Sequence, residues 1–205
     1  DADKIVVTGF SMGSHWGMRL AALDSRVKAV ATAAANYGPK VEIFEKASPR
    51  FKQFFMYMAG IHDEDEFDEF ASQMNLKDIS QDVTCPVLMV TGEYDPLAPL
   101  ETVLAFYDTI PEPKELWVVE NDYHIPRNRP NFGNMDFFPF LIDWLGDALA
   151  GKFPDNHKRE TLVPDRTGCG PYGEQIKGGF RLPERVGAKP GLTEAQAGPG
   201  GVVGG

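Results

Sequence analysis

Cysteine is scarce in this sequence, and the two that it contains, Cys85 and Cys169, lie far apart along the chain. So few cysteines exclude a disulfide scaffold, and their separation excludes the close pairs of a zinc site. We therefore expect a reducing, cytoplasmic setting and no bound metal.

Positive charge is also in short supply. Among 205 residues, 20 Lys and Arg stand against 30 Asp and Glu, which gives a net charge of −10. Nucleic-acid backbones and anionic membranes attract basic surfaces, so we expect neither as a partner. No apolar run reaches the ~20 residues that cross a bilayer. The sequence also lacks a Walker lysine and a dinucleotide glycine pattern, so we expect no cofactor.

Glycine and proline are plentiful but unevenly distributed. Residues 151–205 hold 13 of the 21 glycines and 6 of the 16 prolines. This segment shows no sustained apolar period, so it buries too little apolar surface to offset the loss of backbone entropy. We predict an extended or disordered arm at 151–205 and a catalytic region at 1–150.

Short apolar, β-branched runs alternate with helical patterns along residues 1–150. The runs predict buried strands at 4–8, 26–33, 85–91 and 115–119, and helical patterns fall at 14–23, at about ten residues from Leu100, and at 137–149. This alternation is typical of a parallel α/β sheet. Residues 39–84 are too long for a plain connection, so we predict a helical lid insertion there.

The segment Gly9-Phe10-Ser11-Met12-Gly13 fits the pattern G-x-S-x-G and lies between a predicted strand and a predicted helix. In this setting the serine is lifted clear of the sheet, on a turn so tight that we expect both glycines to be required. The following helix presents free N–H groups, so the Met12 amide is the natural first oxyanion donor. The alternative is a tight turn in which Ser11 only caps the helix.

An acid and a histidine follow the next strands. Asp95 comes directly after the third predicted strand, with Glu93 as its competitor, and His124 comes after the fourth. Because the carboxyl ends of parallel strands share one edge of a sheet, Ser11, Asp95 and His124 are expected to meet. The order serine, acid, histidine is typical of a nucleophile with its base and the acid that orients the base.

Further residues near this edge are candidates for a substrate pocket. Phe10 lies inside the motif, and His15 follows the serine by one helical turn. Aromatic and methionine side chains of the insertion adapt to irregular apolar substrates, so we add Phe54, Phe55 and Met58. The alternative is that these side chains only pack the insertion onto the body.

The motif at 9–13, the turn Gly92-Glu93-Tyr94-Asp95-Pro96 and the run Asp122-Tyr123-His124 resemble the elbow, acid turn and histidine loop of the α/β-hydrolase superfamily. Gly-Phe-Ser-Met-Gly and the spacing are most similar to the group that contains the esterase FrsA, 2,6-dihydropseudooxynicotine hydrolase and the fungal polyketide-shortening hydrolases. The resemblance implies a partial α/β-hydrolase fold, with further strands and a second oxyanion donor ahead of the serine strand. We therefore expect an N-terminal half or a partner chain to complete the sheet, and a homodimer is left open.

The resemblance also implies a serine-dependent hydrolase that acts on a small molecule. The expected substrate is a moderately hydrophobic ester or a compound with a carbon–carbon bond next to a ketone. An acylaminoacyl- or dipeptidyl-type peptidase is an alternative, because it shares the same three motifs. A non-catalytic binding protein of this fold is an alternative of another class.

Overall fold

A single parallel sheet organises the chain. The computed structural model describes residues 2–76, 78–124 and 137–164. Within these ranges five strands pair in the order β1-β2-β3-β4-β5, and every pairing is parallel. The strands are Ile5–Phe10 (β1), Val27–Ala33 (β2), Val87–Gly92 (β3), Lys114–Val119 (β4) and Lys158–Val163 (β5). The predicted parallel α/β class is confirmed.

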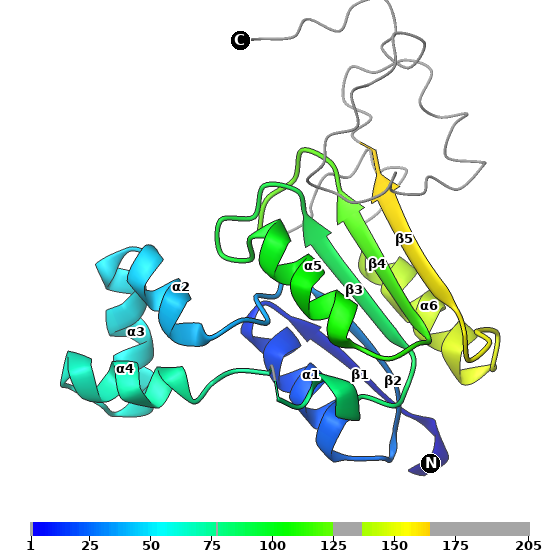
Figure 1. Cartoon of the computed structure of the whole chain (residues 1–205), viewed down its shortest axis with the longest axis horizontal. Coiled ribbons are helices and arrows are strands. Elements are labelled where there is room, and N and C mark those ends of the chain that lie inside the picture. The colour runs from blue at the N-terminus through cyan, green and yellow to red at the C-terminus, as the bar shows by residue number, and fades with distance from the viewer. Residues whose placement is uncertain (1, 77, 125–136, 165–205) are drawn as a thin grey trace, which may run out of the picture.

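Helices cover both faces of the sheet, which makes three layers (Figure 1). The helices α1 (Met12–Leu23) and α5 (Leu100–Thr109) pack on one face, and α6 (Phe138–Leu149) packs on the other. Two short 3-10 helices, η1 (Ala2–Lys4) and η2 (Ser80–Asp82), complete the elements of this body. None of the helices described is long and apolar enough to span a membrane.

Three further helices form the segment predicted as an insertion, between β2 and β3. They are α2 (Lys40–Lys46), α3 (Pro49–Ala59) and α4 (Glu64–Ser72), and they stand to one side of the body, beside the carboxyl ends of β1 and β2 (Figure 1). The insertion has a small apolar core of its own, which includes Phe44 and Phe67. Helices this short are marginal alone, so they depend on that core.

The strand β5 corrects the prediction for the C-terminal segment. It lies inside 151–205, which we expected to be extended or disordered throughout, and it pairs with β4 along its whole length. The high glycine and proline content of the segment as a whole hides this six-residue run, whose second half, Thr161-Leu162-Val163, favours a strand. Residues 165–205 lie outside the described part of the chain.

Candidate active site

Ser11 occupies the turn between β1 and α1, at the carboxyl edge of the sheet. Its backbone has φ 52° and ψ −119°, a conformation that costs free energy for any residue with a side chain. Its N–H donates to the carbonyl of Ala33 at the end of β2, at 2.9 Å. The N–H of Met12 begins the helix and has no acceptor among the residues described.

Only one of the two flanking glycines is sterically required, which corrects our expectation for the turn. A Cβ on Gly9 would lie 2.3 Å from the backbone oxygen of Gly13, and neither chain could move away without breaking the turn. A Cβ on Gly13 would meet nothing within 4 Å. The reason is that β1 passes under the start of α1, so a Cβ on Gly9 would face the backbone of the helix. A Cβ on Gly13 would face open space instead.

The three residues predicted to meet form one hydrogen-bonded chain. The Oγ of Ser11 lies 2.8 Å from Nε2 of His124. On the other side of the ring, Nδ1 lies 2.9 Å from Oδ2 and 3.1 Å from Oδ1 of Asp95. The strands β1, β3 and β4 thus bring together side chains that are 113 and 29 residues apart in sequence.

Asp95, the acid in this series of hydrogen bonds, is held in place by burial and by backbone donors. The side chain of Asp95 is fully buried, and its Oδ1 accepts hydrogen bonds from the N–H groups of Leu97 and Ala98 at 2.8 and 3.1 Å. The competitor Glu93 does not contact the histidine ring; its Oε2 accepts from the N–H of Asn121 at 3.1 Å. Asp95 is therefore the carboxylate that contacts the ring, while Glu93 contacts the loop that carries it.

The histidine loop crosses the end of β3 so closely that only glycine fits there. A Cβ on Gly92 would lie 2.2 Å from the carbonyl oxygen of Tyr123 and 2.6 Å from that of Asp122. The N–H of Tyr94 also donates to the Asp122 carbonyl, at 2.9 Å. This contact sets the short distance between the Asp95 turn and the His124 loop.

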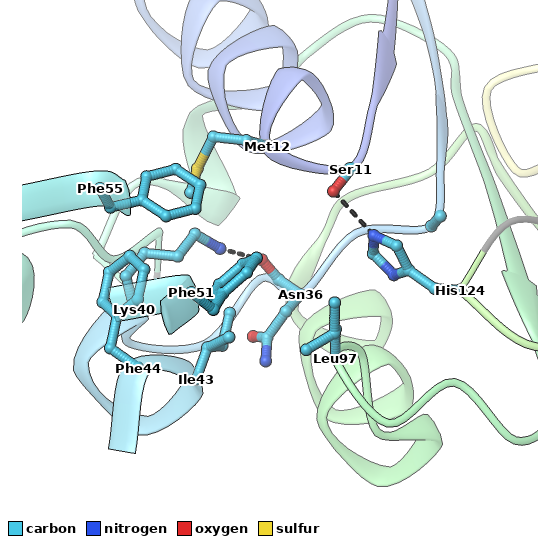
Figure 2. A pocket seen from close by; sticks show the side chains of 11 residues that line it. Ser11, Met12, Asn36, Lys40, Ile43, Phe44, Phe51, Phe55, Leu97 and His124 are labelled. Carbon is cyan, nitrogen blue, oxygen red and sulfur yellow. Dashed lines mark hydrogen bonds between the residues drawn. The ribbon is translucent and has the colours of Figure 1, made fainter. Parts of the chain in front are cut away.

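A cavity of about 70 Å³ opens beside this chain, between the sheet edge and the insertion (Figure 2). Ser11 and His124 lie on one side of it, and the Met12 side chain lies beside Phe55 of the insertion. Its other side is mostly apolar and is lined by Ala34, Asn36, Lys40, Ile43, Phe44, Phe51, Phe55 and Leu97. A second cavity, of about 430 Å³, shares Asn36, Ile43, Phe51 and Leu97 with the first and extends towards α5.

The protein family of this chain is identified by a match along most of its sequence. The profile of the serine hydrolase family FSH1 matches residues 5–135, which is more than half of the chain. The chain belongs to this serine hydrolase family. No curated protein sequence matches this serine hydrolase at a significant level.

Several solved structures share the fold of this chain. It is similar to 2,6-dihydroxy-pseudo-oxynicotine hydrolase (24% identity, TM-score 0.63, covering 77% of this chain and 44% of that one). It also resembles acetyl xylan esterase 1 from a Thermoanaerobacterium species (22%, 0.53, 73% and 46%) and the α/β-hydrolase GrgF from a Penicillium species (19%, 0.55, 73% and 65%). The predicted likeness to the α/β-hydrolases is confirmed, and the chain spans 44% to 65% of the length of these proteins.

Of the residues predicted to line a substrate pocket, the structure places some at the cavity and others away from it. Phe55 lines the cavity, but Phe54 and Met58 are 57% and 65% exposed, because they lie on the outward face of α3. Phe10 packs against Phe137 of the segment before α6, on the other face of the sheet. His15 is buried and is not part of the cavity wall.

Two buried basic groups lie near the elbow. Burial, then the charges of Lys40 and Arg19, lower the pKa of His15 to about 3, so the ring is neutral at physiological pH. Its Nδ1 has no hydrogen-bond partner among the residues described. Burial lowers the pKa of the Lys40 amine to about 7.

Sequence reasoning missed Lys40, which lines the cavity from the start of α2. A signal was present: Gly38-Pro39-Lys40 follows the carboxyl end of the second predicted strand, at the same edge as Ser11. Charged residues are otherwise rare between Ala29 and Val41, so a lysine there stands out. In the described ranges, no cluster of three His, Cys, Asp or Glu side chains is suited to a metal ion.

Proposed function

We propose that this serine hydrolase uses Ser11 as its nucleophile, His124 as its base and Asp95 as the acid that orients the base. The hydrogen-bonded chain from Ser11 Oγ through the ring to the Asp95 carboxylate carries the proposal. A serine hydroxyl is a poor nucleophile unless a base removes its proton, and the base must present the correct nitrogen.

The geometry supports an ordered sequence of steps. Ser11 Oγ attacks the substrate carbonyl while its proton passes to Nε2 of His124, 2.8 Å away. The tetrahedral oxyanion is held by the N–H of Met12, at the positive end of the α1 dipole. His124 returns the proton to the leaving group, and water repeats the same steps on the acyl enzyme. Asp95 stabilises the imidazolium throughout.

The dimensions of the cavities support a small molecule as substrate. An engineered cavity of about 150 Å³ holds a benzene, so about 70 Å³ next to Ser11 accommodates a group of only a few heavy atoms. The adjoining cavity of about 430 Å³ has room for a larger part of the same molecule. The insertion α2–α4 acts as a lid over both, and its aromatic side chains suit a moderately hydrophobic ester or ketone. These dimensions favour an ester or a ketone-adjacent carbon–carbon bond over a peptide.

A further polypeptide segment beyond β1 is part of this proposal. In the sheet described, β1 is the edge strand and pairs with β2 alone. Nearby, Trp16, Leu20 and Leu23 of α1 are 48%, 45% and 63% exposed, an apolar surface that another segment could cover. Whether that segment comes from the same chain, another chain or a second copy stays a prediction, as does a cytoplasmic location.

A fluorophosphonate probe tests the nucleophile. The probe should label the wild-type protein, and Ser11→Ala should lose both the label and at least about a thousandfold in kcat/KM for a short-chain ester. Asp95→Asn should lose a similar factor in turnover, because the ring loses the acceptor that fixes its tautomer.

The matched controls are Ser72→Ala, an exposed serine of α4, and Glu93→Gln, which should both keep labelling and turnover near the wild-type level. Unchanged labelling in Ser11→Ala would refute the nucleophile. Equal losses in Glu93→Gln and Asp95→Asn would mean that the acid is wrongly assigned.

A further inference from the structure

A single cationic side chain lies in the wall of the cavity that Ser11 opens onto. Lys40 is 2% exposed, and its Nζ donates to the backbone carbonyl of Asn36 (Figure 2). An ammonium carries three N–H donors, so two are left for other partners. Apart from the Asn36 carboxamide, whose Oδ1 accepts from the N–H of Gly38, the remaining wall on this side is apolar, and no further hydrogen bond from Lys40 to a side chain is found among the residues described.

The ammonium has no acidic partner among the residues described. The titratable groups around it are His15 of α1 and His124 across the cavity, and the charged residues of the packed helices include Lys52 of α3 and Asp68 of α4. Lys52 and Asp68 pair with each other at 2.9 Å. Burial is the sole cause of the shift in the pKa of Lys40, with no contribution from a carboxylate.

An unpaired buried cation is costly, and an anion bound beside it removes that cost. Fixed in a largely apolar cavity wall, the amine is a strong donor to an anionic oxygen. The net charge of −10 opposes anion entry only weakly, because charges farther than ~8 Å are screened at physiological ionic strength.

We propose that Lys40 binds a carboxylate of the substrate and so selects esters or ketones that carry this group close to the reacting carbonyl. The cavity of about 70 Å³ that Lys40 and Ser11 both line holds only a few heavy atoms, which suits the half-esters of short dicarboxylic acids. This inference rests on the proposed role of Ser11, and it makes Lys40 a specificity-determining residue.

A pair of isosteric esters tests the selectivity. Ethyl hydrogen malonate carries a carboxylate where ethyl malonamate carries a neutral amide. At about pH 6 the wild-type kcat/KM should favour the carboxylate by about ten- to a hundredfold, the range of a charged hydrogen bond. The preference should fall above about pH 7, where the empty site loses its proton. Lys40→Met, of similar length but uncharged, should abolish it.

The control for charge is Lys52→Met, since Lys52 is a lysine of the same insertion that lies outside the cavity wall. It should keep the wild-type preference. An equal response to both esters in the wild type, or a preference that survives in Lys40→Met, would overturn the proposal.

A binding measurement separates this proposal from the role of Ser11. Propanoate should raise the pKa of the Lys40 amine, followed by NMR on lysine-labelled wild-type protein, whereas propanamide should leave it unchanged. If Ser11 proves unreactive but propanoate shifts Lys40, the carboxylate site stands and the proposed catalysis fails. If propanoate leaves the Lys40 titration where it was, the carboxylate site is refuted, whatever Ser11 does.

Discussion

Ser11 shows how a single residue can be held in an unfavourable conformation by its surroundings. Its φ of 52° exposes the hydroxyl above the sheet, and the hydrogen bond from its N–H to Ala33 helps to keep it there. Gly9 allows β1 to pass beneath the helix start at van der Waals contact with Gly13. The close approach of β1 to the helix start at Gly9 therefore helps to keep the backbone of Ser11 in its strained conformation.

Alanine substitutions at the two glycines should have opposite effects on stability. Gly9→Ala forces a methyl group against fixed backbone and should lower the free energy of unfolding by about 1–3 kcal/mol or more. Gly13→Ala places a methyl group in open space inside a helix and should leave stability unchanged or raise it by up to ~1 kcal/mol. Urea unfolding of both variants measures the difference. Equal losses would contradict the steric assignment.

The meeting of the three proposed catalytic residues was accessible to prediction because it depends on chain order and on where the strands end. Ser11, Asp95 and His124 each follow a strand, and parallel strands share one carboxyl edge. The residues of the cavity wall were harder to predict from the sequence, since they depend on which side of α3 faces inwards. Phe51 and Phe55 lie four residues apart and face the cavity, whereas Phe54, between them, faces outwards. Residue type alone does not distinguish these positions.

At the scale of the element, the insertion is held together by aromatic packing. The ring of Phe44 in α2 lies 5.0 Å from that of Phe67 in α4 and 5.1 Å from that of Phe55 in α3. Lys52 and Asp68 add an ion pair between α3 and α4, which is partly exposed and so contributes little. The position of the cavity wall therefore depends on these rings.

Removing Phe67 should loosen the insertion and leave the three-layer body folded. Phe67 is 1% exposed, so Phe67→Ala should cost about 3–5 kcal/mol of local stability. Amide hydrogen exchange should then speed up across residues 40–72, with β1–β4 still protected. Phe54→Ala removes an identical but exposed ring and should leave the exchange of this segment near the wild-type rate. Uniform loss of protection in Phe67→Ala would show that the insertion and body unfold together.

The strands differ in how well sequence predicts them. Most residues of β2, β3 and β4 are buried, which favours an apolar and largely β-branched composition. β1 is only partly buried at the other edge of the sheet, but its run Ile5-Val6-Val7-Thr8 marks it just as clearly. β5 is an edge strand, with exposed Lys158 and Arg159 at its start and half-buried residues after them. Charges on an edge strand protect it from pairing with other chains, but they also conceal it in a glycine-rich segment.

At the scale of the whole molecule, a neutral histidine buried under the elbow links protonation to folding. His15 has a pKa of about 3 in the folded protein against an ordinary value near 6.5. Between these values the unfolded chain binds a proton that the folded chain does not, so stability falls as the pH drops through this window.

His15→Gln should therefore make the fold less sensitive to acid. Going from about pH 7 to about pH 4, the wild type should lose up to ~3 kcal/mol more of its free energy of unfolding than this variant. Urea unfolding across this pH range measures it, because the carboxylates common to both proteins cancel in the comparison. His62→Gln, at an exposed position between α3 and α4, should keep the wild-type slope. Parallel slopes for all three proteins would mean that His15 is already protonated or solvated in the fold.

The order of the strands in the sheet has a consequence for how the protein forms as it is made. Each strand from β2 to β5 pairs with the strand that precedes it in the chain, so each can dock on a finished neighbour as it leaves the ribosome. Short stretches of sequence separate β1 from β2 and β3 from β4, which keeps the entropic cost of these two docking steps low. The step from β2 to β3 must wait for the whole insertion to emerge, and the step from β4 to β5 must wait for α6. Ser11 is thus in place early in synthesis, but its hydrogen bond to His124 forms only when the loop after β4 arrives.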